Sequence, residues 1–261
     1  MAKKQKSNTI KWVDFALFLL VVLSGIFLQF QKPLYNFLTG VVLFGLTVYF
    51  LRQNFPLFGP SLFFFMAYLV SLLPIAKMGL FFLLPLIVYA TIMWLSPKLR
   101  QKSWFFKVGK PGQNTWILGI VTVIVSSTAL YLWVQFGNAN IDDLKAMMPN
   151  WSLWTLILLG ILFAVVNSIV EESIYRGILY DSLKLFMDNR IIVILIQAAI
   201  FGAAHWQGFP RGVSGIVLSF IYGLLLGTIR HRSHGLLAPM VVHIATDFTI
   251  FLLILGEIGK L

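Results

Sequence analysis

Residues 151–170 read WSLWTLILLGILFAVVNSIV, a run of 20 residues that contains no charged side chain. About 20 apolar residues is the length that one transmembrane helix needs. Two glutamates, Glu171 and Glu172, follow this run directly, and Arg176 comes four residues after Glu172. The stretch therefore predicts a membrane-spanning helix that carries ionisable groups at its end.

Eight further apolar segments surround this run and predict an all-α, polytopic transmembrane helical bundle. Together the segments are Trp12–Phe30, Leu34–Leu51, Leu57–Ala76, Leu80–Leu95, Trp116–Phe136, Trp151–Val170, Ile191–Trp206, Val213–Ile229 and Leu236–Leu255. Pro60, Pro74 and Pro85 interrupt the third and fourth segments, and proline disturbs a helix because it removes a hydrogen-bond donor. We therefore expect about 8–9 transmembrane helices.

The composition excludes a soluble globular protein. Hydrophobic residues make up 59% of the 261 residues and charged residues only 11%, whereas soluble chains carry about 45–50% and about 25%. The chain has no cysteine, which excludes disulfides, thiolate metal ligands and a cysteine nucleophile. The net charge of +11 fits cytoplasmic loops facing anionic lipid headgroups. Since no aromatic-and-basic pattern is present, we expect the lipid bilayer as a partner and no nucleic acid.

The basic residues predict how the chain is threaded through the membrane. With the N-terminus in the cytoplasm, 15 of them, including Arg176 and Arg230, fall inside and five outside, as the positive-inside rule requires. We expect a bacterial cytoplasmic membrane, because the chain is short, poor in loops and rich in lysine. The basic stretch Pro97–Gly112 closes an N-terminal group of helices, residues 1–112. Residues 113–261 then hold the candidate catalytic core, with its motifs between residues 171 and 247.

A few ionisable side chains lie in or against apolar sequence: Glu171, Glu172, His205, His243 and Asp247. Such groups are costly at membrane depth and usually face a bundle interior or a water-filled cavity. Glu172 and Arg176 are four residues apart, as are His243 and Asp247, so each pair can meet on one helix face. Pairing with Arg176 would keep one glutamate ionised and leave the other to exchange a proton.

Spacing along the chain predicts that these side chains converge. Glu172 and His205 each lie 16 residues from the polar turn at residues 188–190, or roughly 24 Å along a helix. This arrangement requires the helix that carries Glu172 to continue past Arg176. His243 would lie about 16 Å along the last helix, so helix tilt could bring all three helices to one level. We therefore expect one site inside the membrane that opens towards the cytoplasm.

A site of this composition could activate water in two ways. A glutamate can serve as general base while a histidine shares the proton or stabilises an oxyanion. Alternatively, Glu172, His205 and His243 could bind a divalent metal such as zinc. The HExxH signature of soluble zinc hydrolases is absent from the sequence. The sequence leaves metal dependence open.

Short motifs occur in a fixed order: EESIYR at residues 171–176, FGAAH at residues 201–205 and HIATD at residues 243–247. They resemble the EExxxR, FxxxH and HxxxN/D motifs of the CAAX-protease and bacteriocin-processing (Abi) family of intramembrane proteases. The resemblance covers about Trp151–Leu255. It implies an intramembrane endopeptidase in which Arg176 fixes a glutamate, and which acts on a membrane-associated peptide or protein, such as a lipidated tail or a small peptide precursor.

The resemblance also implies a role for each candidate catalytic residue. Either Glu171 or Glu172 would activate the attacking water, and His205 would position it. His243 and Asp247 would complete the site by stabilising the oxyanion. Many relatives carry asparagine at the last position of the third motif, so Asp247 is a departure that puts its oxyanion role in doubt.

Two other classes of function stay open at this stage. A secondary transporter would also place carboxylates and histidines at membrane depth, but the two halves of the chain show no repeat. A non-catalytic scaffold or bacteriocin self-immunity protein could carry the same side chains without turnover. A catalytically dead Glu172 variant that keeps full cellular function would favour the scaffold.

Overall fold

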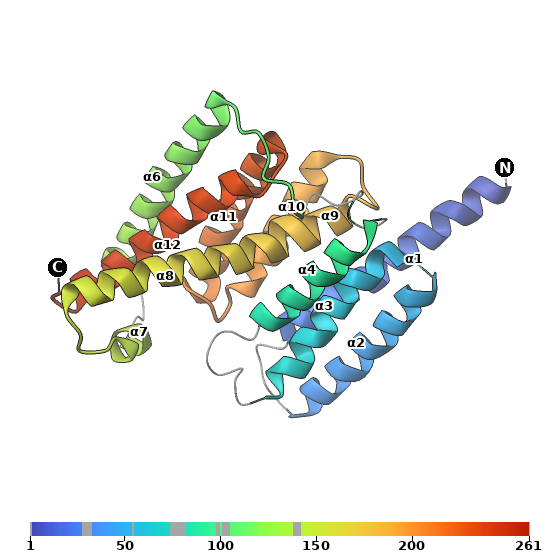
Figure 1. The fold of residues 1–261 in the computed structure, drawn as a ribbon, viewed down its shortest axis with the longest axis horizontal. Coiled ribbons are helices and arrows are strands. Elements are labelled where there is room, and N and C mark those ends of the chain that lie inside the picture. Colours follow the sequence, from blue (N-terminus) through green and yellow to red (C-terminus); the bar gives the residue numbers. More distant parts are fainter. Residues whose placement is uncertain are drawn as a thin grey trace. The chain divides into compact units, whose positions relative to one another are not determined.

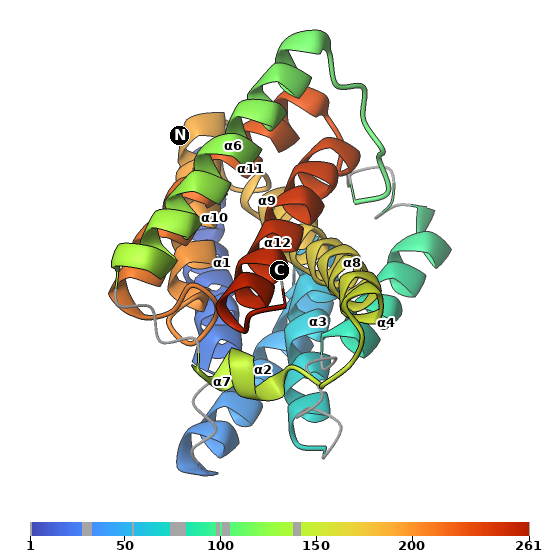
Figure 2. The same cartoon turned by 90° about the vertical axis from the view of Figure 1, so that its left-hand side faces the viewer.

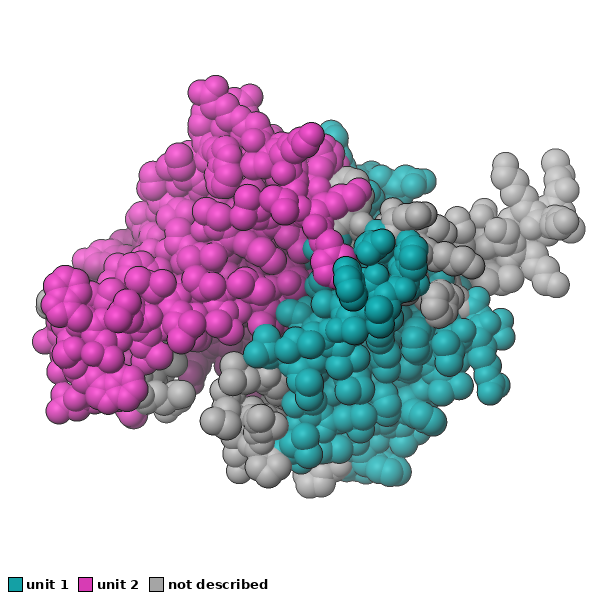
Figure 3. All heavy atoms as spheres, in the orientation of Figure 1, with its two compact units in different colours: residues 1–105, 177–193 teal, residues 106–176, 194–261 magenta. Residues whose placement is uncertain are grey.

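The computed structural model describes residues 2–27, 33–53, 55–73, 82–97, 100, 105–137 and 142–260. Over these residues the ordered elements are all helices, with no strand, which confirms the predicted all-α class (Figure 1). Contacts divide the chain into two compact units, which Figure 3 colours separately. Unit 1 comprises residues 1–105 and 177–193, and unit 2 comprises residues 106–176 and 194–261. The domain division expected at residues 112 and 113 stays a prediction.

Unit 1 is built around one central apolar helix. Its helices are α1 (Ala2–Phe27), α2 (Pro33–Gln53), α3 (Phe55–Ser71), α4 (Leu83–Leu95) and the short α9 (Tyr180–Leu183). Helix α3 packs against α1, α2, α4 and α9. It continues through Pro60, and α4 carries Pro85 in its first turn, where no helix bond needs the missing N–H. Pro74 and the segment ends at residues 28–30, 74–76 and 80–81 lie outside the described residues.

Unit 2 holds the helices that carry the motifs. They are α6 (Gln113–Phe136), α7 (Asp142–Met147), α8 (Leu153–Glu172), α11 (Gly212–Ser233) and α12 (Leu237–Glu257), with most of α10 (Arg190–Ala204). Helix α12 packs against α6, α8 and α11 (Figure 2). Because three helices surround α12, its motif residues are enclosed by protein. Helix α8, a long helix in Figure 1, ends at Glu172 and so carries the first two residues of the EESIYR motif to this group.

Helix length and composition identify this chain as an integral membrane protein. Among the described residues, five helices can cross a bilayer: Leu34–Gln53, Gln113–Phe136, Leu153–Leu183, Gly212–Ser233 and Leu237–Glu257. Four shorter apolar helices occupy the other predicted segments: Trp12–Ile26, Pro56–Ser71, Leu83–Leu95 and Arg190–Ala204. The helix that begins at Leu153 continues past Arg176, as the predicted convergence of the site requires.

Close packing of α10 against α11 depends on two glycines. A Cβ atom at Gly223 would lie 3.1 Å from the Cα of Ala198 and 3.2 Å from the Phe201 ring. One at Gly227 would lie 2.9 Å from Nε2 of Gln197. The fully buried Gln197 donates from that nitrogen to the carbonyl of Gly223 at 2.8 Å. The GxxxG spacing of the two glycines is typical of such close helix packing in membranes.

Replacing Gly223 by valine should lower the stability of the protein. The branched side chain would press on the α10 backbone, and overpacking of this kind costs about 1–3 kcal/mol. It would also displace Phe201, which precedes His205 by one helical turn. The measurement is the thermal midpoint in detergent, with Gly45→Val as control, since a Cβ at Gly45 meets nothing within 4 Å. Equal midpoints for the two variants would contradict the expectation.

Candidate functional site

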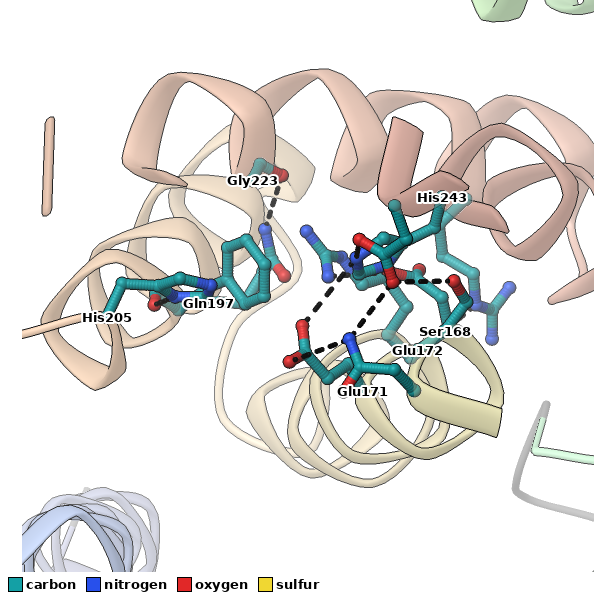
Figure 4. Close-up of polar contacts among 12 residues, drawn as sticks. Ser168, Glu171, Glu172, Gln197, His205, Gly223 and His243 are labelled. Carbon is teal, nitrogen blue, oxygen red and sulfur yellow. Dashed lines mark hydrogen bonds and ion pairs between the residues drawn. The ribbon is translucent and has the colours of Figure 1, made fainter. Parts of the chain in front are cut away.

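His243 lies at the centre of a buried polar cluster in unit 2 (Figure 4). Its side chain is only 3% exposed, and its Nδ1 lies 2.7 Å from Oε1 of Glu172. Its Nε2 lies 3.3 Å from Oδ1 of Asp247 and 3.7 Å from Oε2 of Glu171. The two glutamates come from α8, and the other two residues come from α12, which packs against α8. The structure thus brings together four of the five predicted site residues.

Glu172 is the inner glutamate of this cluster. Its Oε1 accepts hydrogen bonds from Nη1 of Arg176 at 2.8 Å and from Nδ1 of His243 at 2.7 Å. Both Glu172 and Arg176 are fully buried, so the ion pair expected from their spacing is present and shielded from solvent. The guanidinium of Arg176 also lies 4.3 Å from the centroid of the Phe201 ring, a favourable cation–π distance. Glu172 is therefore placed to fix His243.

Helix α8 passes at Glu172 into a π-helical segment, η3 (Ser173–Leu179). The carbonyl of Arg176 within this segment accepts a hydrogen bond from Nε of Arg230 at 2.9 Å. Segments of π-helix inside longer helices often occur at functional sites. The contact from α11 therefore holds the backbone of the first motif.

The burial of these two arginines corrects the position that the sequence predicted for them. Arg176 and Arg230 were expected in cytoplasmic loops, but each is fully buried inside the protein. Local sequence places them beside polar residues and gives no sign of the helix that covers them. Their charges therefore carry no information about which side of the membrane they face.

Glu171 is the more accessible of the two glutamates. Its side chain is 24% exposed, whereas that of Glu172 is fully buried. Its Oε1 accepts a hydrogen bond from Nδ2 of Asn167 at 3.4 Å. Its Oε2 has no hydrogen-bond partner and faces Nε2 of His243. Oε2 of Glu172 also lacks a partner, and both oxygens are buried, so the two glutamates differ in the exposure of the whole side chain and not of this oxygen.

Asp247 is held by two residues that sequence reasoning did not assign to the site. Its Oδ2 accepts hydrogen bonds from Nδ2 of Asn167 at 3.0 Å and from Oγ of Ser168 at 3.1 Å. The available signal was their position one helical turn before Glu171 and Glu172. An ionised carboxylate only accepts hydrogen bonds. In this form Asp247 can orient His243 but cannot itself donate to an oxyanion.

His205 stands apart from the labelled cluster residues (Figure 4), and the ring of Phe201 contacts both His205 and His243. The centroid of that ring lies 4.6 Å from the ring of His205 and 6.3 Å from the ring of His243. Nδ1 of His205 lies 2.8 Å from the Phe201 carbonyl. Because a carbonyl only accepts, Nδ1 carries the hydrogen and Nε2 is left as the acceptor of the neutral ring. Within the described residues, His205 makes no hydrogen bond or ion pair with the other predicted site residues.

Two observations bear on the zinc site that the sequence left open. Among the described residues, no three histidine, aspartate or glutamate side chains form a group that could hold a metal ion. Of the three candidate ligands, Glu172 already pairs with a buried guanidinium, and each histidine packs edge-on against the ring of Phe201. Zinc binding by Glu172, His205 and His243 therefore stays a prediction, and no chemical step below depends on it.

The sequence around this cluster matches a known family of peptidases. A family model described as type II CAAX prenyl endopeptidase Rce1-like matches residues 150–249. Residues 150–249 are therefore similar to this family of endopeptidases. This Rce1-like segment contains all three motifs and every residue of the polar cluster, which confirms the resemblance to the CAAX-protease family. No curated protein and no solved structure matches the chain.

Proposed function

We propose that this protein is an intramembrane endopeptidase that hydrolyses a peptide bond of a membrane-associated substrate. The observation that carries the proposal is the cluster of Glu171, Glu172, His243 and Asp247 on apolar helices of the Rce1-like segment. Ionisable groups at membrane depth are functional by default, because burying them is costly. The substrate would be a lipidated protein tail or a small peptide precursor.

Glu171 is the general base in the proposed mechanism. Its Oε2 takes a proton from a water molecule, which Nε2 of His205 helps to position, and the water oxygen attacks the carbonyl carbon of the scissile bond. When the C–N bond breaks, the proton passes from Glu171 to the leaving nitrogen. A positioned acid–base group of this kind contributes about 10²–10⁴-fold to the rate. The buried Oε2 of Glu171, which has no hydrogen-bond partner and faces Nε2 of His243, supports this choice.

The remaining residues hold His243 in the orientation that the oxyanion needs. Glu172, itself fixed by Arg176, accepts from Nδ1 of His243 and so directs Nε2 towards Glu171 and Asp247. With a proton on Nε2, His243 donates to the oxyanion that forms on the substrate carbonyl. Asp247 orients the ring by accepting from the same nitrogen in the resting site.

The proposal extends to the membrane topology. We infer eight or nine crossings, a cytoplasmic N-terminus and a bacterial cytoplasmic membrane. The excess of basic residues in the inside loops supports this orientation even without the two buried arginines. The site would then receive substrates that are already held at the bilayer.

The test compares membranes that contain wild type with membranes that contain Glu171→Gln, expressed at matched levels in the native host. Quantitative mass spectrometry of peptide termini in membranes and medium should show termini that depend on Glu171. Such termini would establish the peptidase and identify its substrate together. Identical termini, with a folded variant and an intact cellular phenotype, would instead support a scaffold or self-immunity protein.

A further inference from the structure

Asn167 makes a contact that none of the three motifs explains. It lies on α8 one turn before Glu171, and its side chain is half-buried. Its Nδ2 donates to Oδ2 of Asp247 at 3.0 Å and to Oε1 of Glu171 at 3.4 Å. One amide therefore joins the proposed general base to the aspartate that orients His243.

The chemistry of its two partners fixes the orientation of this amide. Both partners are carboxylate oxygens, which accept hydrogen bonds when ionised. The NH₂ group of Asn167 must therefore face them, because its carbonyl oxygen would be repelled. The group has two hydrogens and supplies one to each carboxylate. Both N–H groups of the Asn167 amide are thus used in hydrogen bonds to the two acidic residues.

The bridge separates two acidic groups that compete for one histidine nitrogen. Glu171 and Asp247 lie 3.7 Å and 3.3 Å from Nε2 of His243. Like charges so close in a medium of low dielectric repel each other strongly. A neutral donor between them lowers that repulsion, and Ser168 adds a second donor on Asp247 at 3.1 Å.

The bridge also determines which oxygen of Glu171 is left for chemistry. Oε1 is tied to Asn167, whereas Oε2 has no hydrogen-bond partner and points to His243. We propose that Asn167 is a positioning residue of the hydrolytic site, which holds Glu171 and Asp247 together through one amide and presents Oε2 of Glu171 to the water. The inference rests on the proposed peptidase function.

A purely structural clasp between α8 and α12 would make a different prediction. A clasp only joins the two helices, so its loss should lower the thermal midpoint in parallel with kcat, whereas loss of a positioning residue lowers kcat in a protein that stays folded. A bridge between two carboxylates needs a donor. Asn167→Asp would place a third carboxylate against Glu171 and Asp247, so it should be the more damaging change.

The experiment uses the full-length protein in liposomes and an internally quenched peptide that spans the Glu171-dependent cleavage site. We expect kcat to fall about 100-fold in Asn167→Ala, the effect of misplacing a catalytic group by about 1 Å, with KM within about twofold. The kcat of Asn167→Asp should fall further. In the double variant Asn167→Asp/Asp247→Asn, kcat should be at least about tenfold higher than in Asn167→Asp, because the two positions are coupled. Asn114→Ala, which removes an exposed asparagine in the first turn of α6, is the matched control.

Three outcomes would overturn the inference. One is a kcat for Asn167→Asp equal to or above that of Asn167→Ala, with thermal midpoints that show both variants folded. Another is a loss of kcat in Asn167→Asp/Asp247→Asn that equals the combined losses of the two single variants. Absence of any Glu171-dependent cleavage by wild type would defeat the proposed function itself, and this inference with it.

Discussion

Glu171→Gln should reduce peptide cleavage by about 10³-fold while the protein stays as stable as wild type. Glutamine has the same shape and can still accept the hydrogen bond from Asn167, but it cannot take a proton from water. The side chain is 24% exposed and forms no ion pair with an arginine or lysine among the described residues. We therefore expect a thermal midpoint within about 2 °C of wild type. Turnover of the quenched peptide and thermal unfolding in detergent measure the two quantities.

Glu257→Gln is the matched control for this prediction. Glu257 is similarly exposed, at 31%, and it pairs with Lys145 at 3.3 Å, near the C-terminal end of α12. Losing one exposed ion pair changes stability by at most about 1 kcal/mol, and the change removes a carboxylate without touching the site. Full turnover by Glu171→Gln would exclude Glu171 as the base and leave Glu172 as the candidate glutamate.

Much of the fold was predictable because a bilayer leaves the chain few options. Backbone groups in hydrocarbon must be paired within a helix or a closed barrel, so long apolar runs predict helices. Each predicted segment contains a helix wherever its residues are described. Several helices extend beyond the predicted ends, most of all the one from Leu153 to Leu183, and the short α7 was not predicted. The proline rule was less useful, since α3 runs through Pro60 without ending. Neighbouring helices can satisfy the backbone groups that a proline frees, and local sequence does not reveal them.

The site was only partly predictable, because spacing describes contacts along one helix and not contacts between helices. Positions four apart predicted the pairing of Glu172 with Arg176, and the structure contains that ion pair. Asn167 lies at the same spacing from Glu171, but its bond to Asp247 joins residues 80 apart in sequence, which no pattern along one helix reveals. The depth argument placed His205 at the level of Glu172, yet it could not foresee the Phe201 ring beside His205.

Glu172→Gln should lower the stability of the folded protein, and the loss of activity should follow from this loss of structure. Glu172 accepts hydrogen bonds from Arg176 and His243 in a fully buried place. Removing its charge leaves the guanidinium of Arg176 without its carboxylate where water cannot solvate it. Breaking one side of a buried ion pair costs about 3–5 kcal/mol, which corresponds to a fall of about 10 °C in the thermal midpoint.

A thermodynamic cycle separates this charge effect from a loss of shape. Arg176→Leu alone should also destabilise the protein, because it leaves Glu172 buried without its cation. The double variant Glu172→Gln/Arg176→Leu should lose less than the sum of the single changes, since it leaves no unpaired charge at either position. Additive losses in the cycle would mean that the pair contributes through packing alone. In that case the charge of Arg176 would not be what fixes Glu172 beside His243.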